Sequence, residues 1–246
     1  MKKIILLYAF IFPTILMAQL NSDLGHLYPG EEVVIKTQDD WGKENYKKVI
    51  NEFKNDPLKL GEIVFLGNSI TAGGGNWSLR LDHPNIKNRG IGGDTTDGVL
   101  ARLDEVIYFQ PEAVFLLIGI NDLWNNTLTD SFVNNVGENI IEIAKTIVKK
   151  SPKTKMFVQT VLPIGKQEYI EPIKNLNDII KSNAEFYNVI DLYVEFVNEK
   201  GLMQEELTTD GVHLNEKGYQ KWVETVKPVF YSFKKKSKKP YDTKLF

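Results

Sequence analysis

Short apolar runs alternate with amphipathic segments along most of this chain. The apolar runs, which are typical of buried strands, lie at residues 63–66, 86–89, 113–118, 156–162 and 189–192. Helical periods lie at about residues 95–108, 131–150, 173–187 and 215–233. Strands separated by helices of this length indicate βαβ units and a parallel sheet that is covered on both faces. We therefore expect an α/β fold, a three-layer α/β/α sandwich with a mostly parallel sheet of about five strands and residues 62–66 at its centre.

The two ends of the chain depart from this pattern. Lys2 and Lys3 precede an apolar run from Ile4 to Met17, and a small residue, Ala18, follows at a plausible cleavage point. This is the layout of a secretory signal peptide. The alternative, an uncleaved anchor helix, is less favoured because about 14 apolar residues are short for a bilayer span. We predict export to the periplasm or the extracellular space, with no stable membrane insertion after cleavage.

The predicted organisation is a signal peptide at residues 1–18, an N-terminal lead-in and helix at 19–61, a main α/β domain at 62–233 and a basic tail at 234–246. Within the second part, residues 41–53 place Trp41, Tyr46 and Ile50 near one face of an amphipathic helix. The lysine-rich tail is interpreted as a solvated, frayed end, because a block of like charges does not pack.

Composition excludes several kinds of site. The chain of 246 residues has no cysteine, so a thiol nucleophile, a disulfide and a Cys-ligated zinc are all excluded. A formal net charge of -2 gives no electrostatic case for nucleic acid as a partner. No His-rich or carboxylate cluster has metal-ligand spacing, so we predict neither a metal nor a cofactor. The sequence does not determine the oligomeric state.

Polar, glycine-containing turns follow three of the apolar runs, and a fourth precedes the last helix. They are Gly67-Asn68-Ser69, Gly90-Ile91-Gly92-Gly93-Asp94, Gly119-Ile120-Asn121-Asp122 and Asp210-Gly211-Val212-His213. Ligands of open α/β sheets bind beyond the carboxyl ends of the strands, so we expect these turns to meet there.

A serine at such a position needs a base to remove its proton before it can act as a nucleophile. The chain has three histidines, and His213 follows Asp210 by three residues, close enough for the carboxylate to hold one ring nitrogen. His26 lies in the lead-in and His83 in a loop, and we expect exposed or structural roles for both. Ser69 could also be a helix N-cap, which is partly compatible with a nucleophile.

Together the four turns resemble the SGNH (GDSL-type) hydrolase family over about residues 62–230. The resemblance implies a flavodoxin-like SGNH hydrolase fold, with Ser69 as nucleophile and His213 as general base oriented by Asp210. It also implies an oxyanion hole at Ser69, Gly93 and Asn121. The stretch from Asn88 to Thr96 looks most like the branch that contains the platelet-activating-factor acetylhydrolase catalytic subunits and many bacterial carbohydrate esterases.

Other residues near these turns receive weaker assignments. The family commonly has Asp before the nucleophile, whereas this chain has Asn68, which keeps a side-chain acceptor without the charge. We expect Asp94 and Asp122 to bond loop backbone or cap helices. Trp77 and Trp124 follow the first and third strand turns and are candidates for substrate binding, with a place in the core as the alternative.

The sequence thus predicts an exported serine esterase that hydrolyses short acyl esters, acetyl above all, on carbohydrate. One alternative is a lipid esterase of the acetylhydrolase or lysophospholipase type. The other is an inactive glycan-binding protein on the same fold, because fold alone does not determine function. The expected partner is a small-molecule or glycan ester.

Overall fold

The computed structural model of the chain describes residues 24–124 and 126–237. The predicted signal peptide at residues 1–18 and the end of the predicted tail lie outside the described residues. No helix within the described ranges is long and apolar enough to cross a membrane.

A five-stranded sheet in the order β2-β1-β3-β4-β5 forms the middle layer. Its strands are β1 (Ile63–Gly67), β2 (Ile86–Gly90), β3 (Ala113–Leu117), β4 (Lys155–Gln159) and β5 (Asn188–Ile190). All neighbouring strands are parallel, so the predicted parallel sheet is confirmed. The middle strand is β3, however, and β1 lies beside it rather than at the centre. Strands β1 and β3 are buried at every position, as their continuous apolar runs predict.

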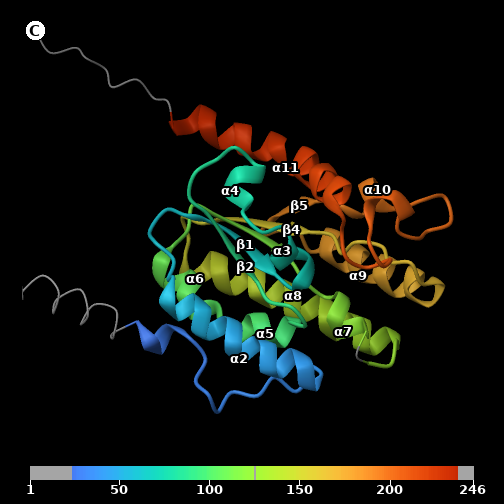
Figure 1. Cartoon of the computed structure of the whole chain (residues 1–246), viewed down its shortest axis with the longest axis horizontal. Helices are drawn as coiled ribbons and strands as arrows, with labels where there is room; N and C mark the ends of the chain where they lie inside the picture. Colours follow the sequence, from blue (N-terminus) through green and yellow to red (C-terminus); the bar gives the residue numbers. More distant parts are fainter. Residues whose placement is uncertain (1–23, 125, 238–246) are drawn as a thin grey trace, which may run out of the picture.

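Helices cover both faces of this sheet. They are α2 (Asp40–Asn55), α3 (Ser69–Gly73), α4 (Trp77–Arg80), α5 (Thr96–Leu100), α6 (Leu103–Phe109), α7 (Ile120–Trp124), α8 (Asp130–Lys150), α9 (Ile170–Ser182), α10 (Tyr193–Phe196) and α11 (Glu216–Ser237), with short 3-10 turns at Gly25–Leu27, Gln167–Tyr169 and Glu205–Leu207. Figure 1 shows α4 and α11 on one side of the sheet, and α5, α6 and α8 on the other. The helix α2 lies on the same side as α5 and α6. The predicted three-layer architecture is therefore confirmed.

Three helices differ from their predicted bounds. The helix expected at residues 173–187 is α9, which begins at Ile170 and ends at Ser182. The helix expected at residues 95–108 is broken into α5 and α6, because Arg102 leaves the helical conformation with φ -122° and ψ 24° and turns its side chain to a buried carboxylate. The last helix continues to Ser237, four residues into the predicted tail. Lysine is a good helix former, so the positive charges of this segment do not end the helix.

Aromatic rings fill the core on the α11 side of the sheet. Phe65 stacks on Phe115 at 4.9 Å and on Trp77 at 4.2 Å between ring centroids. Trp222 and Phe230 of α11 pack against the same group, and the exposed fraction of all five side chains is at most 2%. Burial of this much apolar surface is the main force that holds the helix on the sheet.

A buried ion pair joins the N-terminal segment to the sheet. Arg89 donates through Nε and Nη2 to both carboxylate oxygens of Glu105, at 2.9 and 2.8 Å. The same carboxylate accepts from the Tyr28 hydroxyl at 2.8 Å and from the backbone N–H of Leu58 at 2.9 Å. Arg89 and Glu105 are 3% and 4% exposed, so neither charge has water as an alternative partner.

Glu105→Ala should therefore lower the free energy of unfolding by about 3–5 kcal/mol, because it leaves the Arg89 charge buried without its partner. Urea unfolding measures the change. Lys221→Ala, which breaks a half-exposed pair with Glu195, is the matched control and should change the free energy little. A Glu105→Ala protein no less stable than this control would contradict the assignment.

Candidate functional site

The nucleophile turn connects β1 to α3. Asn68 is the N-cap of α3, and its side-chain oxygen accepts from the backbone N–H of Ile70 at 3.0 Å. Ser69 is the first residue of the helix, where backbone N–H groups have no carbonyl partner within the helix and the helix dipole favours negative charge. The acceptor of Asn68 thus performs the capping that an aspartate would perform at this position.

Ser69, His213 and Asp210, the three residues that the sequence singled out, are in contact. The Nε2 atom of His213 lies 3.0 Å from Ser69 Oγ, and its Nδ1 atom lies 2.7 Å from Asp210 Oδ2. This is the arrangement in which an imidazole accepts the serine proton while a carboxylate holds its second nitrogen. The three groups can therefore carry out nucleophilic acyl transfer.

The carboxylate of Asp210 is held in its charged form by several donors. Its Oδ1 atom accepts from the backbone N–H groups of Val212 and His213, at 2.9 and 2.7 Å. Partial burial opposes ionisation, but the hydrogen bonds from the His213 side chain and from these two N–H groups outweigh it and lower the pKa of Asp210 to about 2. Asp210 thus stays ionised at neutral pH and fixes the orientation of the ring.

Side chains and backbone on both sides of His213 fix its loop. The Thr208 hydroxyl donates to the carbonyl of His213 at 2.6 Å, and the backbone N–H of Thr209 donates to the same carbonyl at 2.9 Å. Asn215 accepts from the backbone N–H of Gly218 at 3.1 Å at the start of α11, which agrees with the predicted helix start. His26 and His83 lie elsewhere, against Tyr108 and the carbonyl of Pro84 respectively, and do not line the site.

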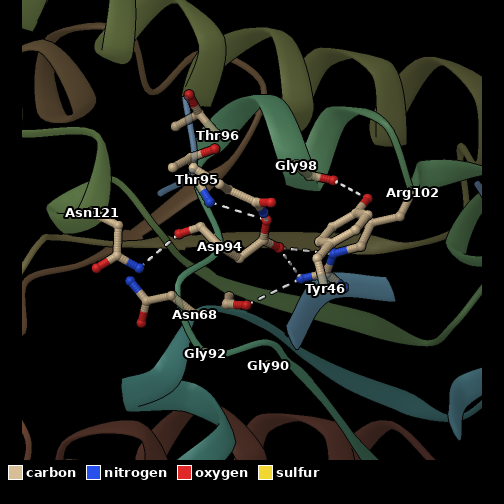
Figure 2. Close-up of polar contacts among 12 residues, drawn as sticks. Tyr46, Asn68, Gly90, Gly92, Asp94, Thr95, Thr96, Gly98, Arg102 and Asn121 are labelled. Atoms are coloured by element: carbon tan, nitrogen blue, oxygen red, sulfur yellow. Dashed lines mark hydrogen bonds and ion pairs between the residues drawn. The ribbon is translucent and has the colours of Figure 1, made fainter. Parts of the chain in front are cut away.

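The second and third turns contribute Gly93 and Asn121 to the pocket that Ser69 lines. Gly93 has φ +78°, a conformation that favours glycine. The Asn121 amide donates to the carbonyl of Asp94 at 2.9 Å, as Figure 2 shows. An asparagine amide has two N–H groups, so the second can donate to an oxyanion in the pocket that Gly93 and Asn121 both line.

A buried ion pair links these turns (Figure 2). Arg102 donates to Asp94 Oδ2 through Nε at 3.0 Å and through Nη2 at 2.8 Å. The Nη2 atom also donates to the carbonyl of Gly67, the last residue of β1, at 3.1 Å. Gln38 donates to the other oxygen of Asp94 at 2.9 Å. Asp94 is therefore structural, as predicted, although the sequence reasoning did not identify Arg102 as its partner.

Asp122, the residue after Asn121, is a second buried carboxylate near the site. It is 2% exposed and accepts from the backbone N–H and the hydroxyl of Thr96, at 3.1 and 2.6 Å. Burial raises the pKa of Asp122 to about 7, while the bonds from Thr96 oppose the rise. Bonds from Asp122 to loop backbone or to a helix start were predicted, and the structure shows a bond to the first N–H of α5. The raised pKa was not predicted.

Ser69, Asp210 and His213 line a pocket of about 370 Å³. Its lining residues are Asp39, Trp41, Ser69, Gly93, Ile120, Asn121, Trp124, Asp210, Val212 and His213. Trp124 lines this pocket, which agrees with its predicted position, and its role in binding stays a prediction. The proposed role of Trp77 is wrong: its ring is 0% exposed, stacks on Phe65 and donates to the carbonyl of Thr71, so it belongs to the core.

Sequence reasoning missed Asp39 and Trp41. Trp41 was assigned to the apolar face of a helix, yet its side chain is 61% exposed and lines the pocket. Both residues come from the segment placed before the main domain, where no strand end marks a site. Helical periodicity identifies the face that a residue shares, but not the element that this face approaches.

A second cavity of about 610 Å³ adjoins the pocket and shares Asp210 with it. Its lining residues are Gly165, Asn198, Glu199, Lys200, Leu202, Met203, Glu205, Thr208, Thr209, Asp210 and Gly211. Hydrogen-bonding side chains therefore predominate in this cavity. Within the described part of the chain, no group of three or more His, Asp or Glu residues is placed to hold a metal ion.

The raised pKa of Asp122 predicts that the free energy of unfolding depends on pH. Since the folded-state value is about 7, the folded chain holds a proton between about pH 4 and pH 7 that the unfolded chain has released. The stabilisation by this group is complete below about pH 4 and is lost as the pH rises through about 7.

Asp122→Asn removes this titration. Urea unfolding at about pH 5 and about pH 8 should show the advantage of the wild type over the variant falling by roughly 2–3 kcal/mol between the two values. Asp104→Asn, at an exposed carboxylate, is the control. An equal pH response in the two variants would refute the raised pKa.

Several known proteins are similar to this chain in sequence. The model of the GDSL-like Lipase/Acylhydrolase family matches residues 65–221. Platelet-activating factor acetylhydrolase IB subunit alpha1 of Rattus norvegicus is 26% identical over 193 residues, which cover 74% of this chain and 81% of the relative. N-acylneuraminate cytidylyltransferase of Escherichia coli is 25% identical over 181 residues, which cover 72% of this chain but only 42% of that longer protein.

Solved structures of proteins with similar descriptions have the same fold as this chain. A structure from Streptococcus pneumonia, named provisionally as a platelet activating factor, has a TM-score of 0.68 and 26% identity, covering 78% of this chain and 95% of the other. A GDSL-like lipase from Bacteroides thetaiotaomicron has a TM-score of 0.67 and 24% identity over 77% and 98% of the two chains, which shows the shared fold. The chain therefore belongs to the GDSL-like lipase/acylhydrolase family and is a serine hydrolase of ester bonds.

Proposed function

We propose that the protein is an exported esterase that removes short acyl groups, acetyl above all, from carbohydrate. The contact of Ser69 with His213, and of His213 with Asp210, in the lining of the pocket is the observation that carries the catalytic part of this proposal. Export rests on the charged and apolar pattern of residues 1–18 alone.

The reaction follows from the positions of the groups. His213 takes the proton of Ser69 as Oγ forms a bond to the ester carbonyl carbon, and the carbonyl oxygen becomes an oxyanion. The backbone N–H groups of Ser69 and Gly93 and the amide of Asn121 stabilise that charge. The ester C–O bond then breaks, and His213 returns the proton to the departing sugar oxygen. Water, deprotonated by His213, hydrolyses the acyl-serine and restores the free hydroxyl.

The adjoining cavity supports a carbohydrate as the alcohol part of the ester. A sugar presents many hydroxyl groups, and Asn198, Glu199 and Thr209 can donate to them or accept from them. The cavity begins at Asp210, so a glycan bound at Ser69 could extend into it. The apolar side chains in its lining are Leu202 and Met203.

A lipid acetylhydrolase is the second candidate, because the curated relatives include platelet-activating factor acetylhydrolase subunits that are 24–27% identical to this chain. Their name refers to an acetyl ester as well. The two candidates thus share the acyl group and differ in the alcohol that leaves, which is the point that an experiment must separate.

Substitutions in the oxyanion turn and the nucleophile turn should differ in effect. Asn121→Ala removes a donor to the transition state and should lower kcat by about 100- to 1,000-fold on a short ester. Asn68→Asp keeps the acceptor that caps α3 and should change kcat by much less. Steady-state rates on p-nitrophenyl acetate measure both. A gain of more than about 100-fold in Asn68→Asp would show instead that a charge is required there.

Substrate panels test the function itself. We expect hydrolysis of p-nitrophenyl esters to fall from C2 towards C12, and acetylated xylan to be deacetylated faster than a 2-acetyl phospholipid. Ser69→Ala should leave only background hydrolysis, because it removes the nucleophile, whereas Ser232→Ala on α11 should match the wild type. Preference for the phospholipid would favour the second candidate. A Ser69→Ala protein with wild-type kcat would rule out the serine mechanism, and inactivity on every ester would favour a glycan-binding protein.

A further inference from the structure

Trp41 is a large aromatic residue in an unusual position. Its side chain is 61% exposed, yet it lines the same pocket as Ser69. It also lies outside residues 65–221, the part of the chain that matches the family model. The family match therefore does not account for this exposed tryptophan in the pocket of Ser69.

The segment that carries Trp41, residues 37–46, is here named the N-terminal clamp because four hydrogen bonds attach it to residues 92–98, which comprise the loop after β2 and the start of α5. The donor and acceptor pairs are Asn45 Nδ2 to Gly92 O at 2.9 Å, Gln38 Nε2 to Asp94 Oδ1 at 2.9 Å, Tyr46 Oη to Gly98 O at 2.8 Å, and the hydroxyls of Thr37 and Thr95 at 2.7 Å. Trp41 is thus held at a defined place on the pocket wall.

The loop is shaped to receive the ring. A Cβ atom at Gly92 would lie 2.9 Å from Trp41 Cη2, and one at Gly93 would lie 3.2 Å from Trp41 Cζ3. A Cβ atom at Gly93 would also lie 2.8 Å from the Cα atom of Gly42. Glycine at these positions allows the indole to lie against the oxyanion turn while most of its surface stays exposed.

The other tryptophan of the pocket is differently placed. The Trp124 ring stacks on Tyr169 with centroids 5.5 Å apart, and Lys166 Nζ lies 3.7 Å from the centre of the same ring. Within residues 24–124 and 126–237, no aromatic or cationic side chain is stacked on Trp41. Trp124 is therefore braced by its neighbours, whereas Trp41 keeps a free surface for a ligand.

A carboxylate stands beside this surface. Asp39 Oδ1 accepts from the backbone N–H of Gly42 at 2.7 Å and caps α2, which fixes the position of the side chain. Asp39 is exposed and lines the pocket, so its second oxygen can accept from a ligand hydroxyl. An aromatic face next to a carboxylate suits a sugar ring, whose C–H groups pack on the indole while its hydroxyls donate to the acid.

We propose that Trp41 and Asp39 form a subsite for the pyranose ring of the leaving alcohol. The ring packs on Trp41 and donates a hydroxyl hydrogen bond to Asp39 while its ester lies at Ser69. This inference rests on the proposed function, and it assigns recognition of the sugar to the N-terminal clamp rather than to the matched family domain.

Two substrates separate the subsite from the catalytic groups. Acetylated xylobiose carries sugar rings, and ethyl acetate, followed by pH titration, carries none. Trp41→Ala should raise KM for the sugar ester about tenfold and leave kcat/KM for ethyl acetate nearly unchanged. Trp41→Phe should restore most of the loss. Asp39→Asn keeps the helix cap and should raise KM for the sugar ester by a smaller factor.

A control variant and three contrary outcomes complete this test of the subsite. Tyr231→Ala removes an exposed aromatic side chain that does not line the pocket and should match the wild type on both substrates. Equal losses of kcat/KM on both substrates in Trp41→Ala would show that the residue only supports the oxyanion turn. No loss on either substrate would show that it has no part in binding. Either result would overturn the subsite. A wild-type enzyme that hydrolyses ethyl acetate but not acetylated xylobiose would instead overturn the proposed function, and the subsite with it.

Discussion

The ion pair between Asp94 and Arg102 is the interaction on which the arrangement of the site depends. Both side chains are buried, and taking two charges out of water is costly unless each polar atom finds a partner. Here Arg102 also bonds the carbonyl of Gly67, and Asp94 is bonded by Gln38. The backbone carbonyl of Asp94 in turn holds the Asn121 amide. The end of β1, the turn at Gly93 and the Asn121 amide thus share one anchor, which would position the proposed oxyanion donors before a substrate arrives.

Most of the fold could be predicted because buried parallel strands are continuous apolar runs. Their bounds were predicted to within about three residues, and the polar turns that follow them identified Ser69 and Asn121. The turn before the last helix identified the Asp210–His213 pair. The break between α5 and α6 at Arg102 could not be predicted in this way, because an arginine within a helical period is expected on the solvated face of the helix. Only the fold shows that its guanidinium reaches a carboxylate eight positions earlier in the chain.

The tryptophans also show that the sequence pattern does not predict which side chains are buried. Trp77 and Trp124 have the same sequence signal, a tryptophan soon after a strand turn, yet one is 0% and the other 42% exposed. Helix α4 packs against the aromatic core, whereas α7 ends at the pocket. Trp41 has the pattern of a core residue and lies at the pocket, because the clamp directs it to two glycines instead of to apolar side chains. Tertiary packing, which periodicity does not encode, decides each case.

The same packing explains why a neutral residue is suitable before the nucleophile. Asn68 is 1% exposed, and its acceptor already satisfies the N–H of Ile70. A carboxylate at that position would need a counter-charge to offset its desolvation. Arg102, the buried cation that bonds the preceding residue Gly67, is already paired with Asp94. A second negative charge would also lie close to the oxyanion that forms at Ser69, where like charges repel. The asparagine therefore keeps the cap of α3 without either cost.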